Sequence, residues 1–204
     1  MKILKILIII LLFYSKANAL IEVDITRGNL NPLPIAVSPL YSDNESASKF
    51  KEILKNDDIG SEIAKIVESN LKKTGLFNPL TKDAFLQKAE IAHLKPRFED
   101  WNLIKAQALI TGKVEIRNDK LRVEFRLWDV LAAQEMLALA FTTVPTNWRR
   151  VGHIITDKVY ERLTGEKGYF DTRIIYVSEE GPKTRRIKKL AIMDQDGENN
   201  KFLT

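Results

Sequence analysis

The 204-residue sequence contains no cysteine and only two histidines. Without cysteine, the chain can form no disulfide, no thiolate metal site and no iron–sulfur cluster, and it cannot use a thiol as a nucleophile. The GxGxxG, phosphate-loop and GxSxG motifs are missing too, so dinucleotide enzymes, NTPases and serine hydrolases lose their best sequence signals. Nine glycines, seven prolines and 45% apolar residues exclude collagen and a mostly disordered chain, and they are typical of a globular protein.

The sequence also lacks a strong excess of one charge. The formal net charge is +5, but residues 1–19 contain three lysines and no acid, so the rest of the chain carries only +2. A nucleic-acid partner would require basic residues gathered on one face of the folded domain. Five of the seven residues from Lys183 to Lys189 are basic, but Arg186, Lys188 and Leu190 alternate with Ile187 and Lys189 in a predicted strand whose solvent side would simply be charged, so we expect no nucleic-acid partner.

The only long apolar run lies at the start of the chain. A basic beginning is followed by nine apolar residues, Ile6 to Tyr14, and by the small-x-small pattern Ala17-Asn18-Ala19. This pattern predicts a signal peptide over residues 1–19, cleaved after Ala19. The alternative, a membrane anchor, is disfavoured because nine residues at about 1.5 Å each cover under half of a bilayer core of about 30 Å. We therefore expect an exported chain with no transmembrane segment after leader removal.

Residues 20–166 show the periodicities of an α+β domain, with an antiparallel sheet and helices on one side of it. The segment 42–49 is polar and is expected to be a loop. Asn118-Asp119 is a two-residue hairpin turn. The expected strands are 21–26, 34–37, 107–117, 120–130 and 135–144, and the expected helices begin near Asp58, Thr81, Asp100 and Asn147, the first and last of them ending at Gly75 and Gly165.

The pattern changes near Lys167. Two strands are predicted at 173–178 and 186–193 around a Gly181-Pro182 turn, followed by a second turn at 194–197. So few strands cannot bury a core of their own. We therefore expect a domain boundary near Lys167, with at most one hairpin in residues 167–204.

Few residues suggest catalysis or metal binding. There is no HExxH motif; His93 lies in a linker, and His153 lies four residues before Asp157 on one helix face, which favours an ordinary helix-surface contact. The segment Asp194-Gln195-Asp196-Gly197 resembles part of an acidic calcium loop, but its third ligand and its bidentate glutamate are missing, which favours a strand-to-strand turn. We expect no catalytic residue, no metal and no cofactor.

The first predicted strand allows two interpretations. Ile21, Val23 and Ile25 alternate with polar residues, and a flexible Gly28-Asn29 stretch follows them. Such a segment can pair with its own sheet as an edge strand, or it can add to the sheet edge of a partner. The residues alone favour the ordinary edge strand.

Several ordered stretches resemble the TolB family, the periplasmic component of the Tol-Pal envelope system. The resemblance covers nearly all of residues 20–204, and its most specific piece is LTGEKGYFDTRIIYV, which carries the junction between the family's two domains. The other stretches are IEVDITRGN, PIAVSPL, DIGSEIAKIVESNLKKTGLFNPL, ALITGKVEIRNDKLRVEFRLWDV, NWRRVGHIITDKVYERLTGEKGYFDTRIIYVS and MDQDGENN.

The resemblance implies a periplasmic binding protein with no catalysis and no cofactor, which helps to maintain outer-membrane integrity and envelope constriction at cell division. In this family an α/β N-terminal domain precedes a six-bladed β-propeller; the N-terminal segment binds the C-terminal domain of TolA, and the propeller binds the lipoprotein Pal. Here that segment departs from the family pattern in detail from Thr26 onward. The implied partner-binding residues are Ile21, Glu22, Val23, Asp24, Ile25, Thr26, Arg27, Gly28 and Asn29.

A propeller blade takes about 40 to 45 residues, so residues 167–204 are expected to be the truncated start of a propeller that lacks the Pal surface. Two other classes of exported protein are alternatives. A CsgG-like or LpoB-like envelope accessory protein would share the small α/β domain and the leader, but it would not explain LTGEKGYFDTRIIYV. A secreted hydrolase would require a carboxylate or histidine constellation that the sequence does not offer.

Overall fold

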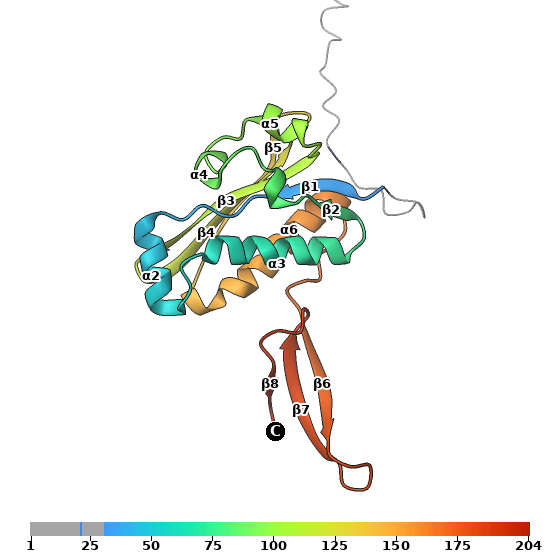
Figure 1. Cartoon of the computed structure of the whole chain (residues 1–204). Coiled ribbons are helices and arrows are strands. Elements are labelled where there is room, and N and C mark those ends of the chain that lie inside the picture. Colours follow the sequence, from blue (N-terminus) through green and yellow to red (C-terminus); the bar gives the residue numbers. More distant parts are fainter. Residues whose placement is uncertain (1–20, 22–30) are drawn as a thin grey trace, which may run out of the picture.

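The computed structural model describes residue 21 and residues 31–204, which fold into two parts (Figure 1). The first, here called the α/β part, contains a five-stranded sheet; the second, here called the C-terminal sheet, contains three strands. The predicted leader lies outside the described residues, as does the predicted strand at 21–26 apart from Ile21. In the described residues, no helix is long and apolar enough to cross a bilayer.

The five-stranded sheet has the strand order β2-β1-β3-β4-β5. β1 is parallel to both β2 and β3, whereas β3, β4 and β5 form an antiparallel meander. The α+β fold class is confirmed, but the sheet is mixed rather than wholly antiparallel, because helices connect β1 to β2 and β2 to β3. The strands are β1 (Leu33–Val37), β2 (Phe77–Pro79), β3 (Ala108–Arg117), β4 (Lys120–Asp129) and β5 (Gln134–Thr143).

The β3–β4 hairpin has a regular register over its full length, from Ala108 opposite Asp129 to Arg117 opposite Lys120. Both turn residues, Asn118 and Asp119, have positive φ angles of 50° and 58°. This is the geometry of the tight hairpin turn that matches the twist of paired strands. The predicted hairpin is therefore confirmed.

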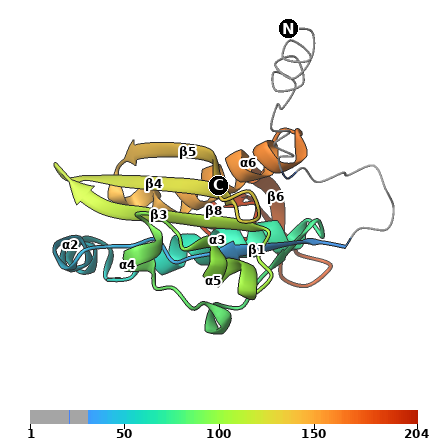
Figure 2. The same cartoon turned by 90° about the horizontal axis from the view of Figure 1, so that it is seen from above.

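Two long helices, α3 (Ile59–Lys73) and α6 (Trp148–Thr164), cover one face of this sheet (Figures 1 and 2). The Asp58 carboxylate caps α3 by accepting a 3.1 Å hydrogen bond from the Ser61 amide. Asn147 occupies the predicted N-cap position of α6, but its side chain makes no capping hydrogen bond and donates instead to Thr143 Oγ1, because a 3-10 turn leads directly into α6. Apolar side chains of both helices and of the sheet form the main core; they include Ile63, Val67, Ile110, Val114, Val123, Phe125, Val151, Ile155 and Val159.

The opposite face of the sheet carries a smaller apolar cluster, so the expectation of helices on one side only is wrong. Trp101 packs there with Leu109 and Trp128, which point away from the main core. The covering helices are α4 (Ala89–Ala92) and α5 (Phe98–Leu103), in front of the sheet in Figure 2. The helix predicted from Thr81 is reduced to a 3-10 turn, 82–84, followed by α4, and Asp100 lies inside α5 rather than at its cap.

Residues 42–49, predicted as a loop, belong largely to the helix α2 (Asn44–Leu54), which is a correction. The Asp43 carboxylate caps this helix through a 2.8 Å hydrogen bond from the Ser46 amide, and Phe50 is fully buried beneath it. Ser46 is buried as well and Leu54 packs against the main core, whereas most other residues of α2 are at least partly exposed. Because residues 42–49 are mostly polar, the sequence showed no sign of the buried Phe50 or of the Asp43 cap.

The C-terminal sheet consists of β6 (Arg173–Glu180), β7 (Ile187–Asp194) and β8 (Lys201–Phe202), all antiparallel. The two predicted strands and the turn at 194–197 are confirmed, and β8 adds a strand beyond the single hairpin expected. Ala191 is the only buried residue between 173 and 204. The apolar side chains of this sheet therefore remain largely at the surface.

Candidate functional site

The predicted partner-binding residues, Ile21 to Asn29, fall almost entirely outside the described residues. Ile21 is described: it is partly buried and packs against the main core of the α/β part. The other eight, Glu22 to Asn29, lie outside, and Asn31 is an exposed residue just before β1. Binding by this segment stays a prediction, and the polar site that the structure does describe lies at the junction of the two parts.

The linker from α6 to β6 is fixed to α6 by one carboxylate. Asp157 accepts hydrogen bonds from the backbone amides of Phe170, at 2.6 Å, and of Asp171, at 3.1 Å. The chain also approaches α6 closely at Gly168, where a Cβ would lie 2.4 Å from the Asp157 Cα. This close approach is the physical reason for a glycine in the LTGEKGYFDTRIIYV stretch.

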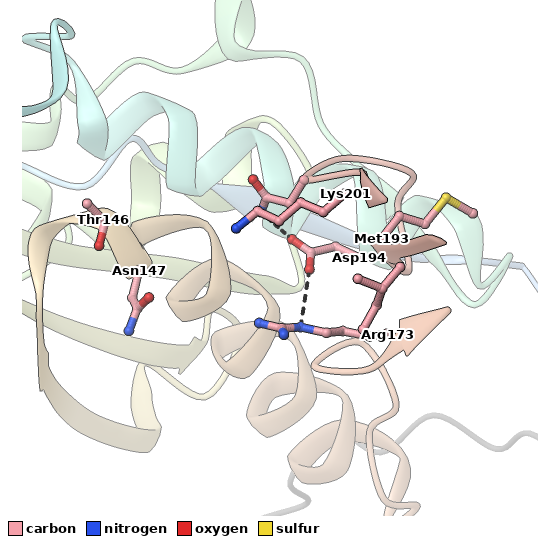
Figure 3. Close-up of a pocket in the computed structure, with 8 residues that line it drawn as sticks. Thr146, Asn147, Arg173, Met193, Asp194 and Lys201 are labelled. Atoms are coloured by element: carbon pink, nitrogen blue, oxygen red, sulfur yellow. Dashed lines mark hydrogen bonds and ion pairs between the residues drawn. The ribbon is translucent and has the colours of Figure 1, made fainter. Parts of the chain in front are cut away.

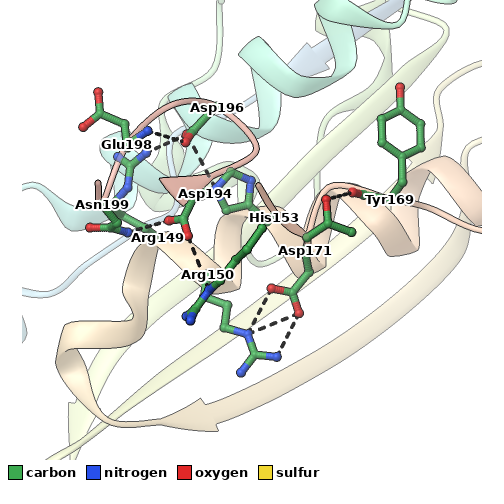
Figure 4. Close-up of polar contacts among 11 residues, drawn as sticks. Arg149, Arg150, His153, Tyr169, Asp171, Asp194, Asp196, Glu198 and Asn199 are labelled. Carbon is green, nitrogen blue, oxygen red and sulfur yellow. Dashed lines mark hydrogen bonds and ion pairs between the residues drawn. The ribbon is translucent and has the colours of Figure 1, made fainter. Parts of the chain in front are cut away.

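Side chains hold the same linker on both flanks. Phe170 is almost fully buried and its ring packs edge-on against Tyr160. Asp171 makes a bidentate pair with Arg150, with distances of 3.0 Å from Nε to Oδ1 and 3.0 Å from Nη2 to Oδ2 (Figure 4). The Asp171 hydrogen bond raises the pKa of the Arg150 guanidinium. Linker and helix therefore behave as one unit.

A buried polar cluster connects α3 and α6. His153 is only 2% exposed, so the predicted helix-surface contact is wrong. Its Nδ1 lies 2.9 Å from Asn70 Nδ2, which also donates to Thr156 Oγ1 at 3.3 Å. Burial lowers the pKa of His153, and the opposing charge of Asp196 offsets this only in part, so the imidazole is neutral at pH 7.

The β7–β8 turn docks on this cluster. Gln195 Nε2 donates to Asn70 Oδ1 at 2.8 Å, and Arg149 Nη2 donates to Asp196 Oδ2 at 2.6 Å. The same Asp196 oxygen lies 3.6 Å from His153 Nε2 (Figure 4). The turn was predicted, but its docking was not, because Gln195 and Asn70 are 125 positions apart and nothing in either local sequence points to the other.

A cavity of about 220 Å³ opens beside the docked turn (Figure 3). Its lining is mostly polar and includes Asn147, Arg173, Asp194 and Lys201. The second histidine, His93, belongs to another region, where its ring stacks on Tyr41 at 4.4 Å between centroids. In the part of the chain that the structure describes, no serine or threonine hydroxyl is paired with a histidine base for nucleophilic chemistry: Thr156 Oγ1 donates instead to the Gly152 carbonyl.

The sequence and the fold were compared with those of known proteins. A family model of the TolB amino-terminal domain matches residues 21–136. The Tol-Pal system protein TolB of Pelagibacter ubique (strain HTCC1062) is 77% identical over 197 residues, which cover 97% of this chain and 44% of that protein. The chain therefore spans less than half the length of that relative.

One solved structure gives the same assignment. The crystal structure of TolB from Acinetobacter baumannii matches with a TM-score of 0.67 and 25% identity, over 91% of this chain and 41% of that one. The LpoB C-terminal domain from Salmonella enterica, with 10% identity over 63% of this chain and 87% of that one, has a TM-score of 0.34, too low to carry an argument. Because the amino-terminal domain model matches more than half of its residues and a curated TolB protein matches nearly all of them, the chain belongs to the TolB family.

Proposed function

We propose that the chain is a periplasmic, non-catalytic interaction component of a Tol-Pal system, and that it contributes to outer-membrane integrity and to envelope constriction at cell division. One observation carries this proposal: 77% identity, over 97% of the chain, to a protein named for that system.

The proposed partner of the N-terminal segment, Ile21 to Asn29, is the C-terminal domain of TolA. Ile21, Val23 and Ile25 alternate with polar residues, so they would all face one side of an added strand. Ile21 already packs on the main core, and β1 begins at Leu33. Both of these flanking contacts belong to the α/β part, and we therefore propose that a TolA strand binds next to it.

Pal is the proposed partner of the propeller region, of which the C-terminal sheet would form the beginning. The apolar side chains of Ile175 and Val177 are more than half exposed. Repeat architectures cover such faces with the next unit, because a single unit cannot bury its own. We therefore place the Pal contact on an assembled propeller rather than on β6–β8 alone.

The TolA proposal is tested by substituting the two faces of the segment separately. Val23→Lys should weaken binding of the TolA C-terminal domain about tenfold or more, because a charge replaces an apolar anchor. Asp24→Asn is the matched control on the opposite face and should leave the affinity within about threefold. Isothermal titration calorimetry measures both affinities, and thermal unfolding checks that neither variant alters the fold.

Deleting residues 20–31 extends the test. Binding should be lost, whereas the melting temperature should fall only slightly, because Ile21 is the only described residue of this stretch that contacts the main core. Equal affinity of the deleted and intact chains would show that the segment is an ordinary structural strand. Stronger loss from Asp24→Asn than from Val23→Lys would contradict the assigned binding face.

A further inference from the structure

The junction contains three potential metal ligands that come from both parts of the molecule. The imidazole of His153 and the carboxylates of Asp194 and Asp196 each offer one atom, and these atoms lie within 4.8 Å of one another. We propose that they form a binding site for a divalent cation of the zinc class, which clamps the β7–β8 turn onto α6.

The state of His153 Nε2 points independently to a ligand. The side chain is 3% exposed, and this nitrogen is buried without a hydrogen-bond partner. It faces Asp196 Oδ2 at 3.6 Å, which is too long for a hydrogen bond. Two ligands of a tetrahedral zinc ion, with bonds of about 2.0–2.2 Å, lie about 3.4 Å apart. The spacing therefore suits a shared cation better than a direct contact.

The groups behind the imidazole can support this role. A histidine that binds a metal through Nε2 must carry its proton on Nδ1, which then donates to an acceptor. Asn70 lies 2.9 Å from Nδ1, and rotation of its amide by half a turn presents the oxygen in place of the nitrogen. Gln195, which bonds Asn70, can turn its own amide in the same way and preserve that contact. The Thr156 hydroxyl, which now accepts from Asn70 and donates to the Gly152 carbonyl, can turn its proton toward the Asn70 oxygen. Two amide rotations and one hydroxyl rotation thus prepare the site.

The surrounding charges set the strength and type of binding. Arg149 Nη2 already lies 2.6 Å from Asp196 Oδ2, and Arg173 Nε lies 3.7 Å from Asp194 Oδ1. A cation must compete with Arg149, so we expect far weaker binding than at a thiolate zinc site. The imidazole donor favours zinc, cobalt or nickel over magnesium and calcium. A cavity of about 60 Å³, lined partly by His153 and Asp194, leaves room for water ligands.

Zinc chloride alone, added to chelator-treated chain, provides the test. The melting temperature should rise with zinc concentration by mass action, whereas equal concentrations of magnesium should have no effect. His153→Gln and Asp194→Asn should each abolish the shift. Glu198→Gln, in the same turn but outside the cluster, is the matched control and should retain it.

Arg149→Gln should change the zinc affinity in the opposite direction to His153→Gln and Asp194→Asn. Removing the competing guanidinium should tighten zinc binding in a calorimetric titration several-fold. Cobalt(II) tests the wild-type chain directly and requires no variant: a bound ion with nitrogen and oxygen ligands in four-fold coordination should produce visible absorption. Absence of both this absorption and the zinc-dependent shift would overturn the proposal, and so would a zinc shift of equal size in His153→Gln.

Discussion

The two sheets of the molecule differ in how far their apolar side chains are buried. The five-stranded sheet is covered on one face by α3 and α6 and on the other by the Trp101 cluster, and its central strands are buried. The C-terminal sheet buries only Ala191 and exposes Ile174, Ile175 and Val177. The first part therefore has a core of its own, whereas the second depends on its contacts with α6 and α3. We therefore expect the α/β part to be more stable than the C-terminal sheet.

The largest expected loss of stability comes from a substitution in the core of the α/β part. Ile155 is 1% exposed on α6, so Ile155→Asp would bury an unpaired carboxylate at a cost of several kcal/mol. Because the total stability of a domain is about 5–15 kcal/mol, this variant should be largely unfolded. Circular dichroism and thermal unfolding measure the loss.

The matched substitution in the other sheet is Val177→Asp. Val177 is 57% exposed on β6, so the same charge stays in water and the melting temperature should change little. If Ile155→Asp melts like the parent chain, the assignment of the core to the five-stranded sheet is wrong. If Val177→Asp unfolds the chain, the C-terminal sheet has a core that its exposure does not reveal.

A smaller effect is expected where the linker joins the two parts. Gly168→Ala would place a methyl group against the Asp157 backbone, and such overpacking costs about 1–3 kcal/mol. Amide exchange in residues 173–194 should become faster, while residues 107–163 keep their protection. Gly165→Ala is the control: its φ of 75° makes the substitution cost about 1 kcal/mol, but nothing within 4 Å would be displaced. Equal acceleration in both variants would show that the close approach does not hold the junction.

The smallest effect concerns α2, which is the least anchored of the longer helices in the α/β part. Asp43→Ala removes its cap and should cost about 1 kcal/mol. The Ser46 backbone hydrogen bond lowers the pKa of Asp43 below its usual value of 3.8. The cap therefore contributes fully above pH 3.8 and is lost as the pH falls through the lower folded-state pKa. The stability difference between parent and variant should disappear in acid; a constant difference would contradict this role.

Strong local periodicity made much of the α/β part predictable. The hairpin around Asn118-Asp119 and the apolar stripes of α3 and α6 each follow from residues close together in sequence. The helix α2 was not predicted because Phe50 is its only buried apolar residue, so it has no apolar stripe. The parallel pairing of β1 and β2 was not predicted because β2 has only three residues, too few to show a strand periodicity.

The junction could not be predicted from local sequence for a different reason. His153 belongs to a helix whose apolar stripe excludes it, and its burial depends on Asn70 and on a turn far along the chain. Long-range polar contacts leave no periodic signal, since each partner looks like an ordinary polar surface residue when only its own segment is considered. Gly168 was not singled out in the sequence either, because its close approach to Asp157 exists only in three dimensions.

The anchoring of the linker also has a mechanical consequence. Asp157 holds two successive backbone amides of the linker, and Arg150, about two turns earlier on α6, holds Asp171 just before β6 begins at Arg173. A force pulling on β6 would therefore act on these hydrogen bonds, and they would transmit it to α6 before the linker could extend. Because Gly152 lets α6 approach Ile66 of α3 closely, the two helices would share that load. The linker thus acts as a stiff coupling between the two sheets rather than as a flexible tether.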